Sequence, residues 1–546
     1  MHIKKTKVHT RTGVKEYLSL VKSYRVSGKK KHKTIMPLGR ADKVDEEHIQ
    51  KIIFGLSRLT KQPSIANNKS FEIQDPNIKI YESMDLGVVL VIEKLWKELG
   101  LSNLIKKIQN KYKKLQFDLE LVFKASVIYR LVKPGSERKM LDWFQDIYLP
   151  GTEKLKLQHL YRGLTIISNH QAEIEDYLLE KSRTLFGIDC SLVFFDTTTT
   201  YFEGDRLDNE ALKQMGRSKD HRPDRTQIKV GMVMSRDGIP IHCSFFAGDE
   251  SDFSILPTVV SDLKEKEGIG EIIFVGDSGM TSKENIENLK RQNISFILGA
   301  RMRNVKVIRE EVCSLDQISI LKNKKLNLRH RVKKNLFVME KTIENKRYII
   351  CYNPEEAKKD KITREKVIAR LEDNLNNSPK KYINHKLHKR FLKITEAKTE
   401  IDLEKAKEEE KFDGLFVIET DTELSPEEVA LRYKDLLLVE RGFRCLKSTL
   451  KMRPVYHKCS ENIQGHIFIS YMALYFFCLM MKKLEQSKEG MQCEEGQILD
   501  SLARIKAHKT EIHGEKLVLR SEINSLNTWI IKSLDIKKPN QVLEKW

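Results

Sequence analysis

The stretch Leu192-Val-Phe-Phe195, directly followed by Asp196, marks the point where the chain changes from helical to strand-like patterning. Further runs rich in β-branched and aromatic residues follow at Ile228–Met234, Ile239–Phe246, Ile272–Val275 and Ser295–Leu298. Helical patterns lie between the later runs, at Ser254–Lys266 and Ser282–Arg291. Strands that begin close together and then alternate with helices are typical of an α/β unit whose sheet continues by crossovers.

Different patterns flank this unit on both sides. Apolar residues recur at three- and four-residue spacing from Leu86 to about Gly187, which predicts a helical domain. Short β-like runs, at 17–21 and 34–38, alternate with basic turns before it. Strand-like runs at 336–338 and 348–351 and charge-rich helices at 362–375 and 401–411 suggest an insertion, because Gly414–Ile418 resumes the buried-strand pattern.

At 546 residues the chain is too long for one core. The patterns predict six segments: a basic β-rich module (1–85), a helical domain (86–187), the first part of the α/β unit (188–300), an insertion (301–411), the second part of the α/β unit (412–485) and a C-terminal helical tail (486–546).

The net charge of +21 favours a polyanionic partner, with nucleic acid as the first candidate. The alternative is a lysine-rich background that spreads solvated charge evenly. The distribution favours the first reading, because residues 1–40 hold 12 Lys and Arg residues and one acid, Glu16. About half of the excess charge therefore lies in the N-terminal module.

The eight cysteines are scattered without a C-x-x-C pair, which argues against a disulfide framework or a cysteine-rich zinc site. His457, Cys459 and His466 remain as an alternative metal cluster. The N-terminus lacks an apolar signal core, and the apolar stretch Ile467–Met481 is shorter than the roughly 20 residues that span a bilayer. We therefore expect a cytoplasmic protein with reduced thiols and no membrane partner.

Two acids follow buried runs: Asp196 after Leu192–Phe195, and Asp277 after Ile272–Gly276. The carboxyl ends of strands are where α/β folds place their sites. An aspartate at a strand end is also a common cap or turn residue, so the position alone does not decide between a structural and a functional role.

A third acid, Glu440, lies on a predicted helix that begins at Ser425-Pro426-Glu427-Glu428, a sequence with the N-cap, proline and glutamate of a helix start. If this helix continues to about Leu450, Tyr433, Glu440, Arg444 and Lys447 lie within about 60° of one another on one polar stripe. An ordinary solvated face would show similar spacing.

These residues carry a resemblance. The segments 194–198 (FFDTT), 275–279 (VGDSG) and 433–447, with Tyr433, Glu440 and Lys447, resemble the three catalytic blocks of bacterial insertion-sequence transposases of the DDE type. The closest group is the IS-four superfamily, whose third block carries the YREK signature. Further similarity lies at 218–224 (SKDHRPD), 453–457 (RPVYH) and 465–467 (GHI). The arginine of YREK is Leu436 here, and Arg432, Lys434, Arg441 or Arg444 could supply its charge.

The resemblance implies an RNase H-like catalytic domain, interrupted by a β-rich insertion before the last acid. It implies that Asp196, Asp277 and Glu440 hold two divalent ions, magnesium with manganese as the alternative, for phosphoryl transfer. It also implies that Tyr433, Arg444, Lys447, His221 and Arg222 contact DNA. The expected partners are the inverted repeats of the element and target DNA, bound by a homodimer associated with the bacterial nucleoid.

Two other functions use the same features. An RNase H-like nuclease would use the same carboxylates without needing the basic module and the helical domain. A non-catalytic DNA-binding protein derived from a transposase would be expected to have lost an acid or part of the chain, and neither loss is visible.

Overall fold

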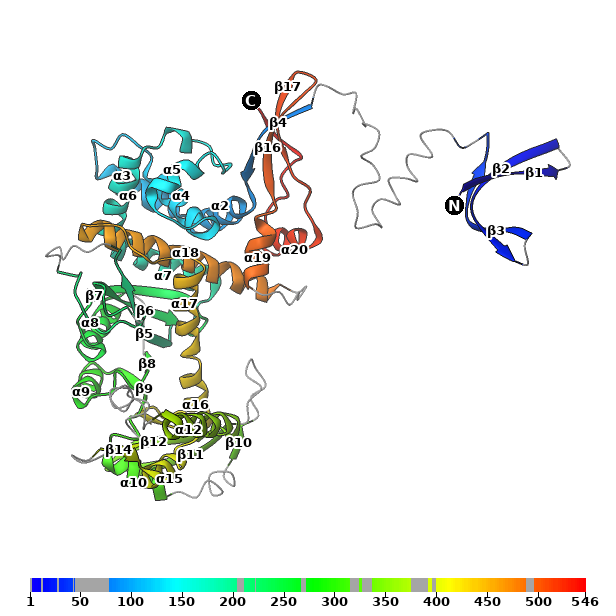
Figure 1. Ribbon diagram of the computed structural model, residues 1–546. Coiled ribbons are helices and arrows are strands. Elements are labelled where there is room, and N and C mark those ends of the chain that lie inside the picture. Colours follow the sequence, from blue (N-terminus) through cyan, green and yellow to red (C-terminus); the bar gives the residue numbers. More distant parts are fainter. Residues whose placement is uncertain are drawn as a thin grey trace. The chain divides into compact units, whose positions relative to one another are not determined.

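The computed structural model describes residues 2–10, 13–26, 29–42, 44, 78–203, 211–220, 222–266, 272–314, 324–326, 336–374, 391–394, 399–487 and 495–546 (Figure 1). The chain divides into two compact units. The first comprises residues 1–79 and 512–514, and the second comprises residues 80–511 and 515–546.

The N-terminal unit holds a three-stranded antiparallel sheet in the order β1-β2-β3. Its strands are β1 (His2–Thr10), β2 (Gly13–Val26) and β3 (Lys29–Arg40). The runs predicted at 17–21 and 34–38 lie within β2 and β3. The β-rich character of this segment is therefore confirmed for the residues that the structure describes.

The second unit is built on a nine-stranded sheet in the order β10-β11-β12-β15-β9-β8-β5-β6-β7. The pairs β5–β8 and β8–β9 are parallel, and the other pairs are antiparallel. The strands are β5 (Leu192–Tyr201), β6 (Gln227–Ser235), β7 (Pro240–Ala247), β8 (Ile273–Gly276), β9 (Ser295–Gly299), β10 (Lys324–Leu326), β11 (Leu336–Ile343), β12 (Lys346–Tyr352) and β15 (Leu415–Thr420). The fold is mixed α/β, and it contains the strand runs predicted between 192 and 298.

The helical segment before the sheet consists of α2 (Gly87–Leu99), α3 (Leu101–Asn110), α4 (Leu119–Val132), α5 (Glu137–Trp143), η2 (Thr152–Lys154), α6 (Leu157–Asn169) and α7 (Gln171–Phe186). The long helix α18 (Ser460–Gln486) runs between these helices and strands β5–β7 (Figure 1) and packs on α4, α6 and β7. By length and composition α18 could cross a membrane, but 78% of its most apolar window is buried inside the protein. It is a core helix, as expected from the sequence.

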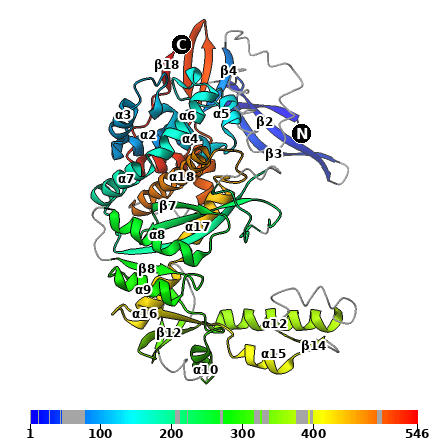
Figure 2. The same cartoon turned by 90° about the vertical axis from the view of Figure 1, so that its left-hand side faces the viewer.

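Helices α8 (Asp252–Glu265) and α9 (Lys283–Arg291) connect the strands of the parallel part and match the two predicted helices. The segment after β9 begins with α10 (Lys306–Ser314), and its strands β10, β11 and β12 extend the main sheet through β15. The rest of it comprises α12 (Pro354–Asn374), the pair β13 (Leu392–Ile394) and β14 (Thr399–Ile401), and α15 (Leu403–Glu410). A small separate core joins these parts, and Figure 2 shows α12 and α15 side by side.

The helix predicted from Ser425 to Leu450 is two helices, α16 (Pro426–Lys434) and α17 (Leu437–Ser448). Its start is as predicted, because Ser425 and Glu428 form a reciprocal capping box. The break lies at Asp435 and Leu436, where the amides of Leu436, Leu438 and Val439 bond to carbonyls three residues back. Such bonds tighten the turn and rotate the second helix away from the register of the first.

The tail was expected to be helical and is mixed instead. It contains α19 (Glu495–Leu502), β16 (Lys506–Ile512), β17 (Glu515–Arg520), α20 (Ser525–Ser533) and β18 (Val542–Lys545). Its strands form a four-stranded sheet with β4 (Ile78–Asp85), in the order β18-β17-β16-β4. The apolar side chains of Ala507 and Val518 are buried, so packing against distant parts of the chain overrides the polar local sequence.

Candidate active site

Asp196 lies in the middle of β5 and not at a strand end, which corrects the position expected from the sequence. The reason is that Thr197–Thr200 continue the strand by pairing with β6. The parallel pairing with β8 does stop at Phe194, so Asp196 lies just beyond that parallel part. Its side chain is 20% exposed, and the Thr197 amide donates to its Oδ1 atom at 2.7 Å.

Asp277 directly follows β8, as predicted. Its Oδ1 atom accepts a hydrogen bond from the Gly279 amide at 2.8 Å, and Arg301 braces the same turn by donating to the Ser278 carbonyl at 3.0 Å. A Cβ atom at Gly279 would lie 2.8 Å from that Oδ1 atom, so a side chain there would displace the carboxylate. Because β5 and β8 are neighbours, the sheet brings Asp196 and Asp277 to the same region.

The two acids influence each other electrostatically. Burial, with the nearby charges of Asp277 and Asp252, raises the pKa of Asp196 to about 6, although Lys219 opposes this shift. A carboxylate that is disfavoured by burial and by like charge is a common feature of functional sites.

Sequence reasoning missed the basic and acidic residues that surround Asp196. The Lys219 ammonium lies 3.6 Å from Asp196 Oδ1 and 3.8 Å from Asp252 Oδ2. Asp252, the first residue of α8, accepts hydrogen bonds from the Thr197 hydroxyl at 2.7 Å and from Lys229 at 3.0 Å. Lys219 lies in the 218–224 motif, so the sequence could have identified it as a site residue. Asp252 and Lys229 could not be identified in this way, because only the folded structure brings β5, β6 and the start of α8 together.

Glu440 lies in the first turn of α17 and is exposed. The helix packs on β5 and β6. Gly442 allows a close approach, because a Cβ atom there would lie 2.8 Å from Met232 of β6. Met232 is the β6 residue paired with Asp196, so α17 crosses the sheet beside the first acid.

The break places Tyr433 on α16 and Glu440, Arg444 and Lys447 on α17, so the four residues do not lie on one continuous helix as predicted. Its hydroxyl approaches the Asp277 turn, since a Cβ atom at Gly299 would lie 2.4 Å from that oxygen and 3.0 Å from the Ser278 amide nitrogen. Burial, followed by the charge of Asp277, raises the pKa of Tyr433. This half-buried tyrosine therefore packs against the core beside the second acid.

Lys447 is half-buried and its ammonium donates to Asp220 Oδ1 at 2.7 Å, while Arg453 contacts the same oxygen at 2.5 Å. Burial lowers the pKa of Lys447. The structure thus places Lys447 in a buried ion pair and not on an open stripe, and sequence reasoning missed both Asp220 and Arg453.

The remaining predicted DNA contacts differ in environment. Arg222 makes a two-pronged pair with Asp224, at 2.9 and 3.0 Å, and lies over the Tyr201 ring. Arg444 is exposed and makes no ion pair with any residue in the described part of the chain. His221 lies outside the described residues.

The three acids do not form a tight single-ion cluster. Among the described residues, one group has ligand atoms that all lie within 4.8 Å of one another, and it does not include them. Two ions about 4 Å apart, each about 2 Å from its oxygen ligands, would separate ligands on opposite ions by as much as about 8 Å. A two-ion site therefore does not require all three acids to lie within 4.8 Å of one another, and an all-carboxylate donor set suits magnesium. The like charges of Asp196 and Asp277, only partly offset by Lys219, are ones that cations would neutralise.

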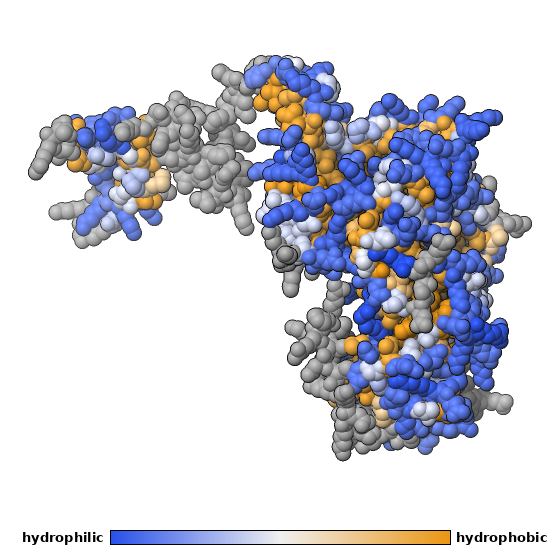
Figure 3. Space-filling view, turned by 180° about the vertical axis from the view of Figure 1, so that it is seen from behind, coloured by the Kyte–Doolittle hydropathy of each residue, from blue (hydrophilic) through white to orange (hydrophobic). Residues whose placement is uncertain are grey.

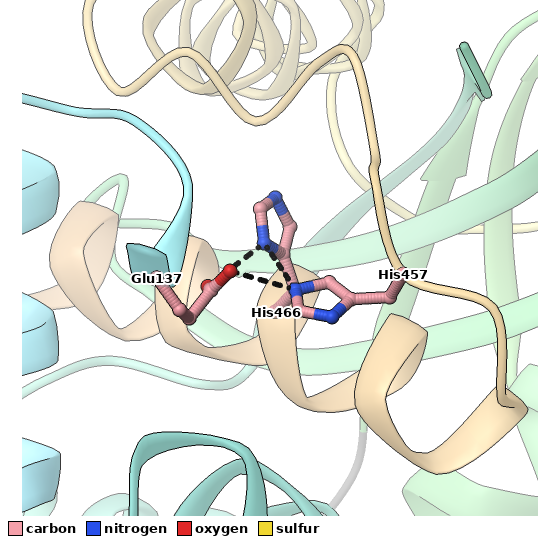
Figure 4. A group of neighbouring side chains, drawn as sticks. All are labelled: Glu137, His457 and His466. Carbon is pink, nitrogen blue, oxygen red and sulfur yellow. Dashed lines mark hydrogen bonds and ion pairs between the residues drawn. The ribbon is translucent and has the colours of Figure 1, made fainter. Parts of the chain in front are cut away.

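The tight group is Glu137, His457 and His466, drawn in Figure 4. His457 Nε2 lies 2.9 Å from Glu137 Oε2, and His466 Nδ1 lies 3.2 Å from Glu137 Oε1. The group is buried and contains Glu137, whereas Cys459 of the alternative cluster is exposed.

A guanidinium already binds two of these three groups. Arg130 Nη2 lies 3.1 Å from Glu137 Oε1 and 3.0 Å from His466 Nδ1. Burial and Arg130 lower the pKa of His466 to about 4, so this ring is neutral, and its Nε2 atom donates to the Met452 carbonyl. Although burial opposes its ionisation, the hydrogen bond from His457 and the nearby charge of Arg130 hold the pKa of Glu137 well below its usual range. The group is a closed hydrogen-bonded network.

Comparison with known proteins identifies the family of this chain. A solved structure described as the cryo-EM structure of the piggyBac transposase synaptic complex with hairpin DNA is similar at 10% identity over 76% of this chain and 78% of that chain, with a TM-score of 0.35. No curated protein matches the sequence. Residues 3–68 match the N-terminal domain of IS1634 family transposases. Residues 191–476, more than half of the chain, match the transposase DDE domain. The chain therefore belongs to the transposase DDE family and is a bacterial insertion-sequence transposase, an enzyme that cleaves DNA.

Proposed function

We propose that Asp196, Asp277 and Glu440 hold two magnesium ions, with manganese as the alternative, and that this site cleaves and joins DNA strands. Transposases with a DDE domain use divalent metal ions, and carboxylate oxygens are the ligands that magnesium prefers. When bound, such ions activate a water or a 3′-hydroxyl and stabilise the leaving oxygen of an in-line displacement. The observation that carries the proposal is that β5 and β8 bring Asp196 and Asp277 together while α17, with Glu440, packs on β5.

The chain's own groups orient these ligands. The Thr197 amide and the Lys219 ammonium fix one oxygen of Asp196, and the Gly279 amide fixes one oxygen of Asp277. Glu440 stands exposed at the start of α17, where a DNA strand can reach it. Each acid thus retains a carboxylate oxygen that is not committed to these orienting contacts.

The catalytic core is RNase H-like in this proposal. Three antiparallel strands, β7-β6-β5, are followed by the parallel strands β8 and β9, and the first two acids lie on β5 and directly after β8. The segment 301–411 then separates β9 from the strand and helices that lead to Glu440. This order supports the interrupted domain that the motif resemblance implies.

The substrate is double-stranded DNA: the inverted-repeat ends of the element and the target, bound by a homodimer. The N-terminal sheet supports DNA binding, because Lys22 pairs directly with Lys33 and Tyr24 with Lys31. Residues two apart on a strand share a face, so the three exposed lysines and the tyrosine form one surface. Like charges directly opposite each other destabilise a sheet, which indicates that a polyanion compensates them. The face seen in Figure 3 carries hydrophilic side chains with apolar ones between them.

The residues proposed to contact the phosphates near the catalytic site are Lys447, Arg444 and Arg222, with His221 as a further candidate. The role of Tyr433 is different, since its hydroxyl lies near the Asp277 turn and is suited to supporting it. Arg444 stands free of ion pairs in the described region, whereas Lys447 and Arg222 are already held by Asp220 and Asp224.

The test is cleavage of DNA that carries the element's ends by the full-length protein. Asp196→Ala should abolish cleavage while binding in a gel shift changes little, because the phosphate contacts remain. Replacing Lys22, Lys31 and Lys33 by Gln in the full chain should lower the slope of log K against log salt by up to about 3, since each lost phosphate contact removes about 0.9. Normal cleavage by Asp196→Ala would refute the assignment of the first acid.

A further inference from the structure

Two neighbouring residues of opposite charge, Lys219 and Asp220, reach to different parts of the catalytic region. Lys219 extends to β5, beside Asp196. Asp220 extends to Lys447 of α17 and to Arg453, which follows that helix. A single turn of the chain therefore contacts both the strand that carries the first acid and the helix that carries the third.

The Lys219 side of this turn is fastened by several bonds. Its ammonium donates to the Thr197 carbonyl at 2.6 Å and to the Thr197 hydroxyl at 2.8 Å. Its backbone amide donates to the Thr199 hydroxyl at 2.9 Å. The turn itself is closed by the Ser218 hydroxyl, which accepts from the amides of Asp220 and Arg222 at 3.2 Å each. These bonds fix the position of Asp220 relative to β5.

The Asp220 side chain is 4% exposed, and its Oδ1 atom receives both Lys447 and Arg453. Its Oδ2 atom is also buried and has no hydrogen-bond partner in the described part of the protein. A buried ion pair is weak evidence for a stabilising role, and a buried oxygen without a hydrogen-bond partner adds a cost. Stability alone therefore does not explain why an aspartate occupies this position.

The two cations around Asp220 carry one more positive charge than the carboxylate neutralises. The Arg453 side chain is 32% exposed and that of Lys447 is 15% exposed, so Arg453 presents the surplus charge to solvent. Arginine binds phosphate oxygens through its planar, forked donors. The group offers a rigidly held site for a single phosphate.

We propose that the Lys219–Asp220 turn positions the catalytic region: Asp220 holds Lys447 and Arg453 as a paired cationic site for one DNA phosphate, in fixed register with Asp196. The inference rests on the proposed DDE function and adds Arg453 as a phosphate-binding residue. Lys219 and Asp220 are positioning residues, because they act through Asp196, Lys447 and Arg453.

The experiment uses the full-length protein, magnesium and DNA with the element's ends. Asp220→Asn should slow cleavage by roughly 100-fold, as misplacement of a reacting group by about an ångström can. It should also spread the cut over neighbouring phosphodiester bonds. Lys447→Met should act similarly, and the double variant should cleave no more slowly than the slower single variant. Independent losses that multiply in the double variant would overturn the proposal.

Asp220→Glu separates positioning from charge, because it keeps the carboxylate and lengthens the side chain by one methylene. We expect it to melt close to the parent and to cleave at least tenfold more slowly. Parent-like cleavage would overturn the proposal, as would parent-like cleavage by Asp220→Asn.

The matched control is Asp237→Asn, which disrupts another Asp–Lys pair, with Lys482 at 2.9 Å and a similarly covered lysine. It should cleave at the parent rate, and its melting temperature reports how much such a pair contributes to stability. Asp196→Ala, tested in parallel, separates the two levels of inference. If Asp196→Ala cleaves normally, the proposed DDE function is wrong. If the losses of Asp220→Asn and Lys447→Met multiply in the double variant, only the proposed positioning role of Asp220 is wrong.

Discussion

Two groups of charged residues in the second unit differ in how completely their charges are compensated. Around Glu137, His457 and His466 every charge faces a partner, and Arg130 completes the network. Around Asp196 and Asp277 two acids face each other, Glu440 stands exposed nearby, and Lys219 only partly compensates the first acid. By distance alone the first group is the better metal site. By charge the second is, because the like charges of Asp196 and Asp277 are only partly compensated by Lys219, whereas Arg130 compensates the first group.

The difference shows that proximity of ligand atoms and suitability for a cation are separate properties. A guanidinium inside the tight group binds the same lone pairs that a metal would use. The looser acids leave oxygen atoms uncommitted, and two ions require a wider spacing than one. Amide substitutions that keep the shape but remove the charge should therefore have opposite consequences in the two regions.

The largest effect is expected for Asp277→Asn. Loss of an ion ligand removes several kcal/mol of transition-state stabilisation, so cleavage should fall by more than about 1,000-fold. The melting temperature without metal should not fall, since a repulsive charge beside Asp196 is removed. Cleavage assays and thermal unfolding of the same preparation check both. A large fall in melting temperature would mean that Asp277 is part of a compensated network like that of Glu137.

The reverse is expected for Glu137→Gln. It leaves the buried Arg130 without a countercharge, and breaking such a pair costs about 3 to 5 kcal/mol. The melting temperature should fall clearly, while cleavage at low temperature, where the variant remains folded, should stay near the parent rate. Chemical denaturation and a cleavage assay at reduced temperature provide the measurements.

Zinc tests the same region directly. Because Arg130 occupies the group, added zinc should not raise the melting temperature of the parent through this site. Zinc-dependent stabilisation that disappears in His457→Ala would show that the guanidinium yields to a metal, and the contrast between the two regions would then be wrong.

Sequence patterns predicted strands and a helix start that carry the site, but not the contacts that join its residues. The β-branched runs that became β5, β6, β7, β8 and β9 were visible because buried strands require such residues, and Ser425 with Glu428 specified the start of α16. The break at Asp435 was not visible, since the apolar periodicity continues through it. The contacts of Lys219, Asp220 and Asp252 join residues that are far apart in sequence, so no local pattern encodes them.

A smaller effect is expected for Asp196→Asn, whose melting temperature relative to the parent should depend on pH. The pKa of Asp196 is about 6 in the folded protein, against an ordinary value of 3.8. The folded state therefore holds the proton more tightly, and ionisation destabilises it as pH rises through this window, by up to about 3 kcal/mol above pH 6. Metal-free Asp196→Asn should melt above the parent at pH 8 and level with it near pH 4. Magnesium should reduce the difference at pH 8 by stabilising the parent. A variant that melts below the parent at pH 8 would place Asp196 among the compensated groups.

The smallest effect is expected for Arg444→Ala, which probes the open side of the catalytic region. Arg444 is exposed on the helix that carries Glu440 and has no ion-pair partner in the described chain, so its removal should leave the melting temperature unchanged. If it contacts one phosphate, the salt slope of DNA binding should fall by about 0.9, and cleavage by roughly three- to tenfold. Arg291→Ala, which removes an exposed arginine paired with Glu287 on α9, is the control and should change neither. An unchanged slope for Arg444→Ala would mean that Arg444 does not contact DNA. Lys447 on α17 and Arg453 in the loop after it would then be the cations that do.

The phosphate contacts would in that case depend on the pair held by Asp220. Leu436 is buried in the turn before α17, so an arginine at that position could not replace the missing contact without leaving the core.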